Sequence, residues 1–450
     1  MSPISKIIGR ASELSDTGQG LVRIGKELYA VSNLLPKEEA LLEINSDFQY
    51  QKARVLKILK PSPIRQDPGC EVFQKCGGCQ LLHMDYKSQI EFKKDYVLNA
   101  FKEEKLSLKI DDVITAASPF HYRNKMQVAF RYKEGKLVYG FFEEESHRVT
   151  PIISCPVQTK AQNEIVKDIQ NLMVAMKIPA YNEDKRTGLV RFALIKEAFN
   201  TGEIMVVIVT QGENFPGRND FQRRLREKHP EITTIVQNIN TRQTSIILGD
   251  QERVIFGPGF IVEELLGMKF KISSKTFFQI NPEQTAKLYQ KILDYGEFTK
   301  DETVIDAYCG MGTIGMVVSP YVKQVIGVES NKQSVINGVE NLRLNHLNNL
   351  QLINDDATLF LEKTAKTDRP VDAIILDPPR SGSTEKFLKA ILAIKPKKVI
   401  YVSCEAKTLA RDLRFLQNDY VMKKVAIVDM FVGTYHVETV CQLVLKEKTK

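Results

Sequence analysis

The hydrophobic pattern changes character several times along the chain. Residues 1–60 alternate short apolar stretches with turn signals at Asp16–Gly20, Ile24–Lys26 and Pro36–Lys37, a spacing that predicts a small β-barrel. The prolines of Lys60–Pro63 then predict a break that acts as a linker. Apolar residues recur at helical spacing over Tyr86–Phe101, which predicts an amphipathic helix.

Beyond this helix, the pattern mixes strands and helices and then becomes regular. From Gln127 to about Glu264, β-rich runs such as GEIMVVIVTQ and TSIILGD alternate with helical runs such as QNEIVKDIQNLMVAM. This alternation predicts a mixed α and β middle domain. From Ile272 onward the order is strand, glycine turn, helix and strand, which predicts an α/β region with a parallel, doubly wound sheet.

Composition limits the class of protein. With 450 residues, of which 43% are hydrophobic, the chain is expected to fold into two to four domains. Its apolar runs fall short of the roughly 20 residues that span a bilayer, and MSPISKIIGR lacks the apolar core of a signal peptide. We therefore expect a cytoplasmic protein without a membrane partner. The net charge of +8 fits a polyanionic partner such as nucleic acid.

The glycine turn of the last region indicates a nucleotide-like cofactor. Gly310, Gly312 and Gly315 match G-x-G-x-x-G, and the following strand ends at Glu329, where an acid can bind ribose hydroxyls. A nicotinamide cofactor would explain these residues. However, Asp306 directly before the turn would repel a pyrophosphate. The cationic S-adenosylmethionine, which has no phosphate, suits acidic strand ends better.

Two later strands end in reactive groups. One leads into Asp377-Pro378-Pro379-Arg380 and the next into Cys404, so a carboxylate and a thiol from neighbouring strand ends could activate one substrate between them. Cys404 alone could equally be a small buried apolar residue.

Four of the seven cysteines suggest a metal site. Cys70, Cys76 and Cys79 form C-x5-C-x2-C, and Cys155 supplies a distant fourth thiol. Four thiolates suit either a [4Fe-4S] cluster or tetrahedral zinc, and the spacing does not choose between them.

In their order along the chain, these motifs resemble a known family. They are CGGCQLLH, FFQINPEQ (Phe277–Gln284), DAYCGMGTIG (Asp306–Gly315), GVE ending at Glu329, NDDA (Asn354–Ala357), LDPPRSG (Leu376–Gly382), YVSC ending at Cys404 and HVETV (His436–Val440). The chain resembles the RNA uridine C5 methyltransferases of the class I S-adenosylmethionine-dependent fold. More narrowly, it resembles the iron-sulfur-containing 23S rRNA branch with an N-terminal TRAM domain.

The resemblance implies three domains. Residues 1–60 would form a TRAM or OB-like RNA-binding barrel. Residues 61–92 and 119–265 would form a mixed α+β central domain, in which Cys70, Cys76, Cys79 and Cys155 hold the [4Fe-4S] cluster. Residues 93–118 and 266–450 would form a Rossmann-like catalytic domain.

The resemblance also implies site residues. Cys404 would add to carbon 6 of the uracil, which makes carbon 5 nucleophilic, and Glu438 would remove the carbon 5 proton. The S-adenosylmethionine pocket would be lined by Gln279, Tyr308, Glu329, Asp356 and Asp377. Of these, Glu329 would bind the ribose, Asp356 the adenine amino group, and Tyr308 would pack on the cofactor. Alternative interpretations are that Tyr308 is core, that Gln279 only starts a helix, and that Asp355 replaces Asp356.

The implied substrate is RNA, most closely 23S rRNA, with transfer RNA as the alternative and 5-methyluridine as the product. The target base would leave its stack, and the protein would act as a monomer without a protein partner. His121–Lys125, Arg191, Arg223 and Arg224 could contact phosphates or be ordinary surface charges.

At Thr313 and at Phe431–Thr434 the chain differs from residues found in relatives, and these differences concern details of the pocket. Two other functions compete with uridine methylation: an amino-group methyltransferase that uses the DPPR loop, and a non-catalytic RNA-binding protein on a methyltransferase fold.

Overall fold

The computed structural model describes residues 5–44, 53–143, 148–244, 246–367 and 369–447. It divides into two compact units. The first consists of Met1–Tyr96, Tyr139–Pro156 and Phe431–His436, and the second of Val97–Val138, Val157–Met430 and Val437–Lys450. Among the described residues, no helix is long and apolar enough to cross a membrane.

The first unit begins with an antiparallel sheet. Its strands are β1 (Ser5–Leu14), β2 (Gly20–Ile24), β3 (Glu27–Val31), β4 (Glu39–Ile44) and β5 (Ala53–Lys60), in the order β3-β2-β1-β4-β5. The outer strands β3 and β5 also contact each other, so the sheet curls into the expected barrel around Val22, Val31 and Leu42. The predicted turns lie between these strands. β5 ends before Pro61, although Ser62 is buried rather than part of a solvated linker.

The rest of the first unit contains little regular structure. The helix predicted over Tyr86–Phe101 is confirmed as α1 (Tyr86–Glu103), and the division between the units crosses it after Tyr96. β9 (Val149–Pro151) pairs antiparallel with β8 (Lys136–Phe142), of which residues 139–142 belong to this unit.

The second unit contains the predicted mixed α and β region. Its strands β7 (Lys125–Lys133), β10 (Val190–Glu197), β11 (Ile204–Thr210), β12 (Ile232–Ile239) and β13 (Gln251–Phe256) follow the order β13-β12-β11-β10-β7. α2 (Lys160–Ala175) packs against β10, and α3 (Arg218–Lys228) packs against α2 and β13. The hairpin of β14 (Phe260–Leu265) and β15 (Met268–Ser273) follows.

One predicted β-rich run in this region is wrong. The described residues of Thr244–Asp250 form no strand, and Ser245 lies outside the described residues. The Asn240 side-chain amide donates hydrogen bonds to the carbonyls of Ile246 (2.7 Å) and Ile247 (2.8 Å). These side-chain bonds occupy the carbonyl groups that a strand would use.

The last sheet confirms the doubly wound α/β prediction. Its strands are β6 (Asp112–Ile114), β16 (Thr303–Ala307), β17 (Gln324–Glu329), β18 (Leu350–Asn354), β19 (Ala373–Leu376), β20 (Lys398–Ser403), β21 (Tyr420–Val428) and β22 (Glu438–Leu445). Their order is β18-β17-β16-β19-β20-β22-β21-β6. β22 runs antiparallel to both of its neighbours, whereas β16 to β20 are mutually parallel.

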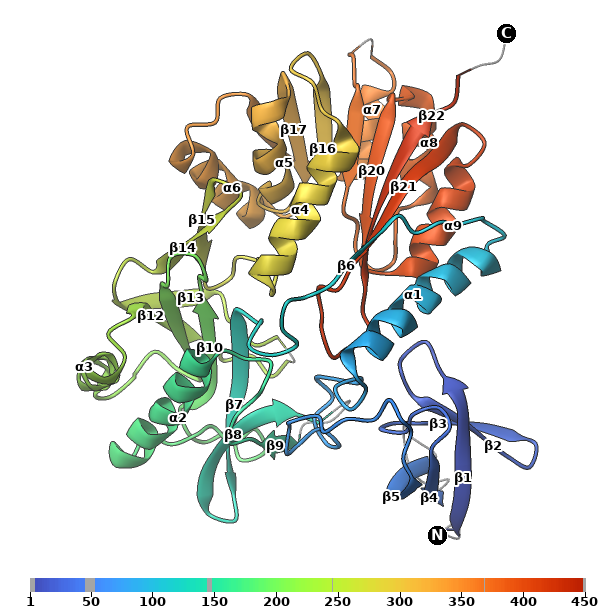
Figure 1. Cartoon of the computed structure of the whole chain (residues 1–450). Coiled ribbons are helices and arrows are strands. Elements are labelled where there is room, and N and C mark those ends of the chain that lie inside the picture. The colour runs from blue at the N-terminus through green and yellow to red at the C-terminus, as the bar shows by residue number, and fades with distance from the viewer. Residues whose placement is uncertain (1–4, 45–52, 144–147, 245, 368, 448–450) are drawn as a thin grey trace. The chain divides into compact units, whose positions relative to one another are not determined.

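Helices flank this sheet (Figure 1). They are α4 (Pro282–Gly296), α5 (Thr313–Val318), α6 (Lys332–Leu344), α7 (Ala357–Thr364), α8 (Glu385–Ile394) and α9 (Ala406–Leu416), with the 3-10 turn η1 (Ser319–Tyr321) after α5. Because the parallel strands share one direction, their carboxyl ends meet at one edge, which is where such sheets bind ligands.

Candidate active site

A cavity of about 450 Å³ lies at the carboxyl edge of the last sheet. It is lined by Lys275, Thr276, Phe277, Phe278, Gln279, Tyr289, Tyr308, Cys309, Gly310, Met311, Thr313, Ile314, Asn331, Gln333, Ser334, Asn337 and Asp377. The structure therefore brings together three of the predicted cofactor residues, Gln279, Tyr308 and Asp377. The volume falls within the usual range for small-molecule sites.

The loop after β16 is a strained wall of this cavity. Tyr308 has a φ of 60°, a left-handed conformation that is unusual for a tyrosine. Its ring packs on Phe387, with ring centroids 5.1 Å apart, so Tyr308 contacts both the core and the cavity. Gly315 is required at its position, because a Cβ atom there would lie 2.9 Å from Asp306 Oδ2. The Gly315 N–H donates to that oxygen at 2.8 Å.

Asp306 of β16 is buried and is not among the residues that line the cavity. Its pKa is raised to about 7, first by desolvation and then by Asp377 and Glu329, against the lowering effect of the Gly315 hydrogen bond. Its Oδ1 has no hydrogen-bond partner among the described residues. A carboxyl group that titrates near neutral pH thus lies just before the glycine turn.

Glu329 and Asp356, also predicted for the cofactor, are not among the residues that line the cavity. Glu329 accepts the N–H of Gly310 at 3.0 Å and that of Asn331 at 2.6 Å, so it braces two cavity residues. Asp356 is exposed and caps α7, where its Oδ1 accepts the Leu359 N–H at 3.0 Å. Asp355 pairs with Lys363 at 2.8 Å. The cofactor contacts of Glu329 and Asp356 remain predictions.

Cys404 and Glu438 come from neighbouring strands of the same edge. In the antiparallel pair β20–β22, Ser403 is the partner of Thr439. Cys404 is the residue directly after β20, and Glu438 is the first residue of β22, so both lie one residue beyond this last register pair. The charge of Glu438 acts on the Cys404 thiol. Asp377 directly follows β19, whose Leu376 pairs with Tyr401 of β20. The thiol and the two carboxyls thus belong to three adjacent strand ends.

The electrostatics of this group favour protonated forms. Burial raises the pKa of Glu438 to about 8, with Asp377 adding to the shift, and burial raises the pKa of Asp377 to about 7. The pKa of the partly exposed Cys404 thiol is raised to about 12 by desolvation, then by Glu438 and Asp377, against the opposing effect of Arg380. The two carboxyls therefore titrate near neutrality beside a protonated thiol.

The sequence did not single out several residues of the cavity. Tyr289 Oη lies 2.9 Å from Thr313 Oγ1, which gives the unusual Thr313 a partner across the cavity wall. Phe277 is 73% exposed, whereas its neighbours Thr276 and Phe278 are buried. The sequence shows two adjacent phenylalanines, Phe277 and Phe278, but it does not show which of the two rings is exposed to solvent.

The arginines that were predicted as phosphate contacts differ in their exposure to solvent. Arg191 is wrong as a phosphate contact, because it is buried and its guanidinium binds Glu183 and the carbonyls of Asn240 and Arg242. Arg223 and Arg224 are exposed and pair with Asp220.

The predicted metal ligands Cys70, Cys76, Cys79 and Cys155 all lie in the first unit and are partly buried. However, no group of three or more His, Cys, Asp or Glu in the described part of the chain is arranged to hold a metal ion. Cys76 and Cys79 instead line a separate cavity of about 620 Å³ with barrel residues such as Ser32 and Arg54.

Comparisons with known proteins identify the family of the chain. Residues 85–448 match the family model described as tRNA (uracil-5-)-methyltransferase. An uncharacterized RNA methyltransferase of Halalkalibacterium halodurans is 37% identical over 438 residues, which cover 96% of both chains. One of Staphylococcus aureus is 34% identical over 445 residues, covering 97% of this chain and 98% of the relative.

A solved structure is similar over nearly the whole chain. It is the Pyrococcus abyssi tRNA (uracil-54, C5)-methyltransferase in complex with S-adenosyl-L-homocysteine, with a TM-score of 0.78, 26% identity, and coverage of 97% of this chain and 99% of that chain. The expected fold, that of the S-adenosylmethionine-dependent methyltransferases, is thereby confirmed. The chain belongs to the tRNA (uracil-5-)-methyltransferase family and is an RNA methyltransferase.

Proposed function

We propose that this enzyme transfers a methyl group from S-adenosylmethionine to carbon 5 of a uridine in RNA, with Cys404 as nucleophile and Glu438 as base. The observation that carries the proposal is that Cys404 and Glu438 each lie one residue beyond the last register pair of β20 and β22, Ser403–Thr439, at the same sheet edge as Asp377, which lines the cofactor-sized cavity. The Pyrococcus abyssi relative in complex with S-adenosyl-L-homocysteine supports the choice of cofactor.

In the proposed mechanism, Cys404 forms a bond to the uracil ring and Glu438 accepts a proton from it. Carbon 5 of uracil is a weak nucleophile, so the Cys404 sulfur first bonds to carbon 6 and its proton is lost to a neighbouring base or solvent. S-adenosylmethionine supplies the methyl group that the activated carbon 5 takes. Glu438 then accepts the carbon 5 proton, the carbon 5–carbon 6 double bond re-forms, and the sulfur leaves.

The pKa values of Cys404 and Glu438 are raised by burial and by neighbouring acidic groups. A sulfonium cation held by the Asp377 side of the cavity would oppose these effects and would favour the thiolate and the ionised carboxylates. We therefore propose that cofactor binding prepares the thiol for attack.

A trapping experiment tests this mechanism. RNA containing 5-fluorouridine should form a stable covalent complex, because fluorine on carbon 5 cannot leave as a proton. Denaturing gels and peptide mapping should place the adduct on Cys404 in the wild type and in Cys441→Ala, whose substituted thiol lies in the same sheet opposite Tyr401. An adduct elsewhere, or none, would contradict the proposed nucleophile.

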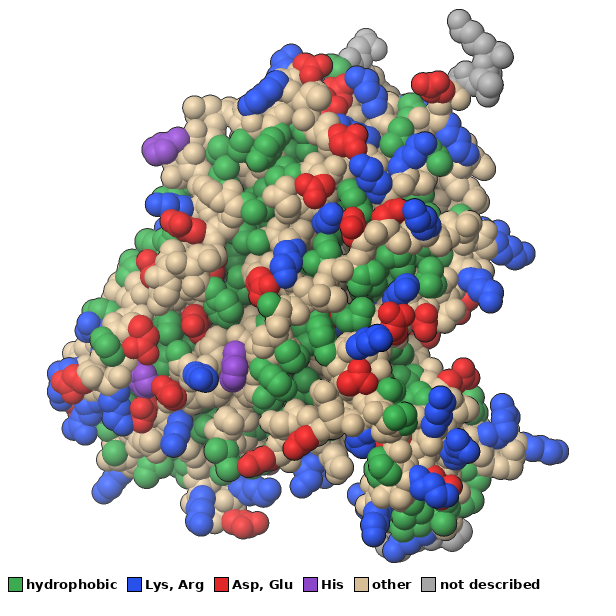
Figure 2. Space-filling view, in the orientation of Figure 1, with side chains coloured by type: hydrophobic (Ala, Val, Ile, Leu, Met, Phe, Trp, Pro, Cys, Tyr) green, Lys and Arg blue, Asp and Glu red, His purple; other side chains and the backbone are tan. Residues whose placement is uncertain are grey.

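We propose 23S rRNA as the substrate, on the resemblance of the cysteine motif and the N-terminal barrel to the ribosomal branch. Lys6, Arg10, Arg23 and Lys26 are exposed on the barrel, and Figure 2 shows basic side chains gathered there, which suits an RNA backbone. Transfer RNA is a second candidate, because the Pyrococcus abyssi relative is a tRNA methyltransferase. Mass-spectrometric mapping of 5-methyluridine in both RNAs from cells lacking the protein decides between them.

We propose a [4Fe-4S] cluster at Cys70, Cys76, Cys79 and Cys155. The donor type fits, since thiolates are the usual ligands of such clusters, and all four cysteines lie in one unit. Among the described residues, no group of three or more His, Cys, Asp or Glu is arranged to hold a metal ion. We assign no reaction step to the cluster. Anaerobic purification with iron, zinc and visible-absorption measurements tests the proposal, and a colourless zinc protein would refute it.

A further inference from the structure

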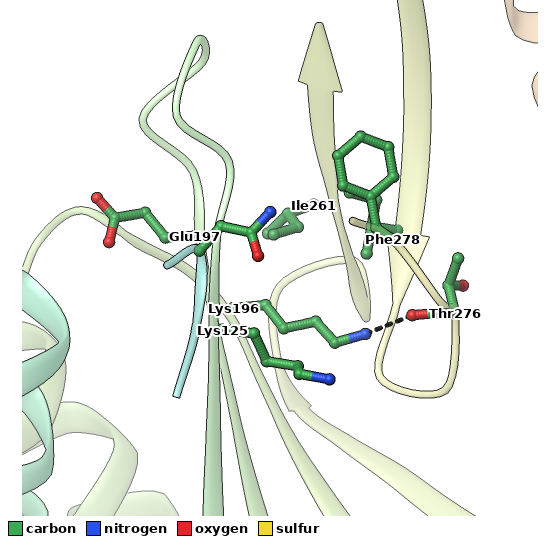
Figure 3. Close-up of a pocket in the computed structure, with 8 residues that line it drawn as sticks. Lys125, Lys196, Glu197, Ile261, Thr276 and Phe278 are labelled. Atoms are coloured by element: carbon green, nitrogen blue, oxygen red, sulfur yellow. Dashed lines mark hydrogen bonds between the residues drawn. The ribbon is translucent and has the colours of Figure 1, made fainter. Parts of the chain in front are cut away.

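Two lysines face each other in the central sheet of the second unit. Lys125 of β7 and Lys196 of β10 are direct register partners, and like charges in this position destabilise a sheet. Figure 3 shows both side chains extending toward the turn that contains Thr276, while the Glu197 carboxylate points away from them. A small cavity of about 20 Å³, which is enough for one water molecule, lies between these groups.

Lys196 is the more buried of the two and makes specific contacts. Its Nζ donates to the carbonyl oxygens of Ser273 at 2.9 Å and Thr276 at 2.7 Å. Desolvation, and then Lys125, lower its pKa to about 7, against the opposing effect of Glu252. Burying a lysine beside a second lysine lowers the stability of the protein. The two hydrogen bonds to the turn offset part of this loss, and they explain why a lysine occupies this position.

The turn that Lys196 holds continues into the wall of the cofactor cavity. Thr276, Phe277 and Gln279 all line that cavity. From the other side, Asn337 of α6 donates to Thr276 Oγ1 at 3.1 Å and lines the same cavity.

Asn124, at the start of the same central sheet, fixes the other end of the segment. Its side-chain amide donates to the carbonyl of Gln279 at 2.9 Å, and its backbone N–H donates to that of Ile280, also at 2.9 Å. Residues 273–280 are thus anchored at both ends by the central sheet, while their middle faces the cofactor cavity.

We propose that Lys196 is a positioning residue for the cofactor: it holds the Ser273–Thr276 turn so that the following residues form one wall of the cofactor site before the cofactor arrives. This inference rests on the proposed use of S-adenosylmethionine. Preorganised walls favour binding because no ordering of the loop remains to be done. The central sheet would then contribute to cofactor affinity without touching the cofactor.

The test compares two isosteric substitutions of the full-length protein. Lys196→Met removes both hydrogen bonds to the turn, whereas Lys125→Met removes the facing charge but no contact with the turn. We expect Lys196→Met to raise the calorimetric Kd for S-adenosylmethionine about tenfold, because it loses both hydrogen bonds to the Ser273–Thr276 turn. It should raise the KM for the cofactor similarly while kcat at saturating cofactor stays within about twofold. Lys125→Met should leave the Kd for S-adenosylmethionine within about twofold.

Thermal unfolding without cofactor separates positioning from mere structural support. Removal of a buried charge should leave the unfolding midpoint of Lys196→Met unchanged or higher. An unchanged Kd, or a lower kcat together with a lower midpoint, would overturn the inference. If Lys196→Met does not fold, Lys196→Gln, which keeps one donor, should show a smaller rise in Kd, and an unchanged Kd would again overturn it. Wild-type protein that binds no S-adenosylmethionine would instead contradict the proposed function.

Discussion

Two buried glutamates, one in each unit, have carboxyl groups whose pKa values are shifted in opposite directions. Glu38 in the first unit is fully buried and accepts hydrogen bonds from the Leu35 N–H at 2.8 Å, the Ser62 N–H at 3.1 Å and Arg65 Nη2 at 2.7 Å. Burial alone would raise its pKa, but Arg65 and the two backbone donors outweigh burial, and the pKa is lowered.

Glu438 in the second unit is almost as buried, at 3% exposure, but it faces Asp377 instead of an arginine. Its pKa is raised to about 8, first by desolvation and then by Asp377. Burial alone therefore does not determine the pKa of a carboxyl, because neighbouring groups can oppose or add to the effect of burial. Glu38 stabilises the fold as an anion, and Glu438 is poised to exchange a proton near neutral pH.

The largest expected effect is on the thiol beside Glu438. Cys404→Ala should reduce 5-methyluridine formation about 10⁴-fold or more, because the substitution removes the nucleophile. Cys441→Ala, in the same sheet and fully buried, should retain activity within a few-fold. Mass spectrometry of the RNA product measures both. Activity retained in Cys404→Ala would favour the alternative amino-group methyltransferase.

A second effect should separate the base from the nucleophile. Glu438→Gln keeps the shape of the side chain but cannot accept the carbon 5 proton, so turnover should fall by about 10²- to 10⁴-fold. The methylated RNA should then remain bonded to Cys404, visible as a slow band on denaturing gels with natural RNA. The double variant Cys404→Ala/Glu438→Gln should show no band. Rapid release of methylated RNA from Glu438→Gln would show that another group removes the proton.

On the other side of the comparison, Glu38→Gln should destabilise the protein. This substitution leaves the guanidinium of Arg65 partly buried without its counter-ion, which typically costs about 3 kcal/mol or more. The neighbouring Glu39→Gln is the control, because Glu39 pairs with a largely exposed lysine, Lys60, and such pairs contribute about 1 kcal/mol at most. Urea denaturation of both variants measures the difference. Equal stabilities would show that the Glu38–Arg65 pair does not hold the first unit.

Hydrophobic periodicity predicted much of the fold. The barrel strands, α1 and the parallel sheet all follow from local signals, such as the turn residues near Gly18 and Gly25 and the glycine turn after β16. The run Thr244–Asp250 was misassigned, because the side chain of Asn240, which is not part of the run, binds the carbonyls of Ile246 and Ile247. Apolar composition alone does not reveal such a competitor.

The site was only partly predictable for a related reason. Cys404 and Asp377 were predicted because they follow strand-like runs, and Glu438 was predicted from the family resemblance; their roles remain predictions. The sequence contained no comparable signal for Tyr289, Asn337 or Lys196, since each reaches the site from a different element through side-chain contacts. Arg191 was misread because charge suggests exposure, while its partner Glu183 is apparent only in the folded chain.

The smallest expected effect is on the pH dependence of stability, where the two glutamates should differ in sign. For Glu438, the folded-state pKa of about 8 lies above the usual 4.5, so the folded state binds more protons than the unfolded state between these values. Its contribution to stability is complete below about pH 4.5 and is lost as pH rises through about 8. For Glu38, whose pKa is lowered, the contribution is present above about pH 4.5 and is lost as pH falls.

Urea denaturation at pH 5 and pH 9 should reveal this difference. Glu438→Gln should become more stable relative to wild type on going from pH 5 to pH 9, because a glutamine does not have to ionise in the buried site. Glu38→Gln should show its deficit throughout this range, since Glu38 is ionised at both values. A constant difference between Glu438→Gln and wild type would mean that Glu438 is already ionised at pH 5. In that case Asp377, whose pKa is also raised by burial, would be the group that holds the proton, and Asp377→Asn should show the gain instead.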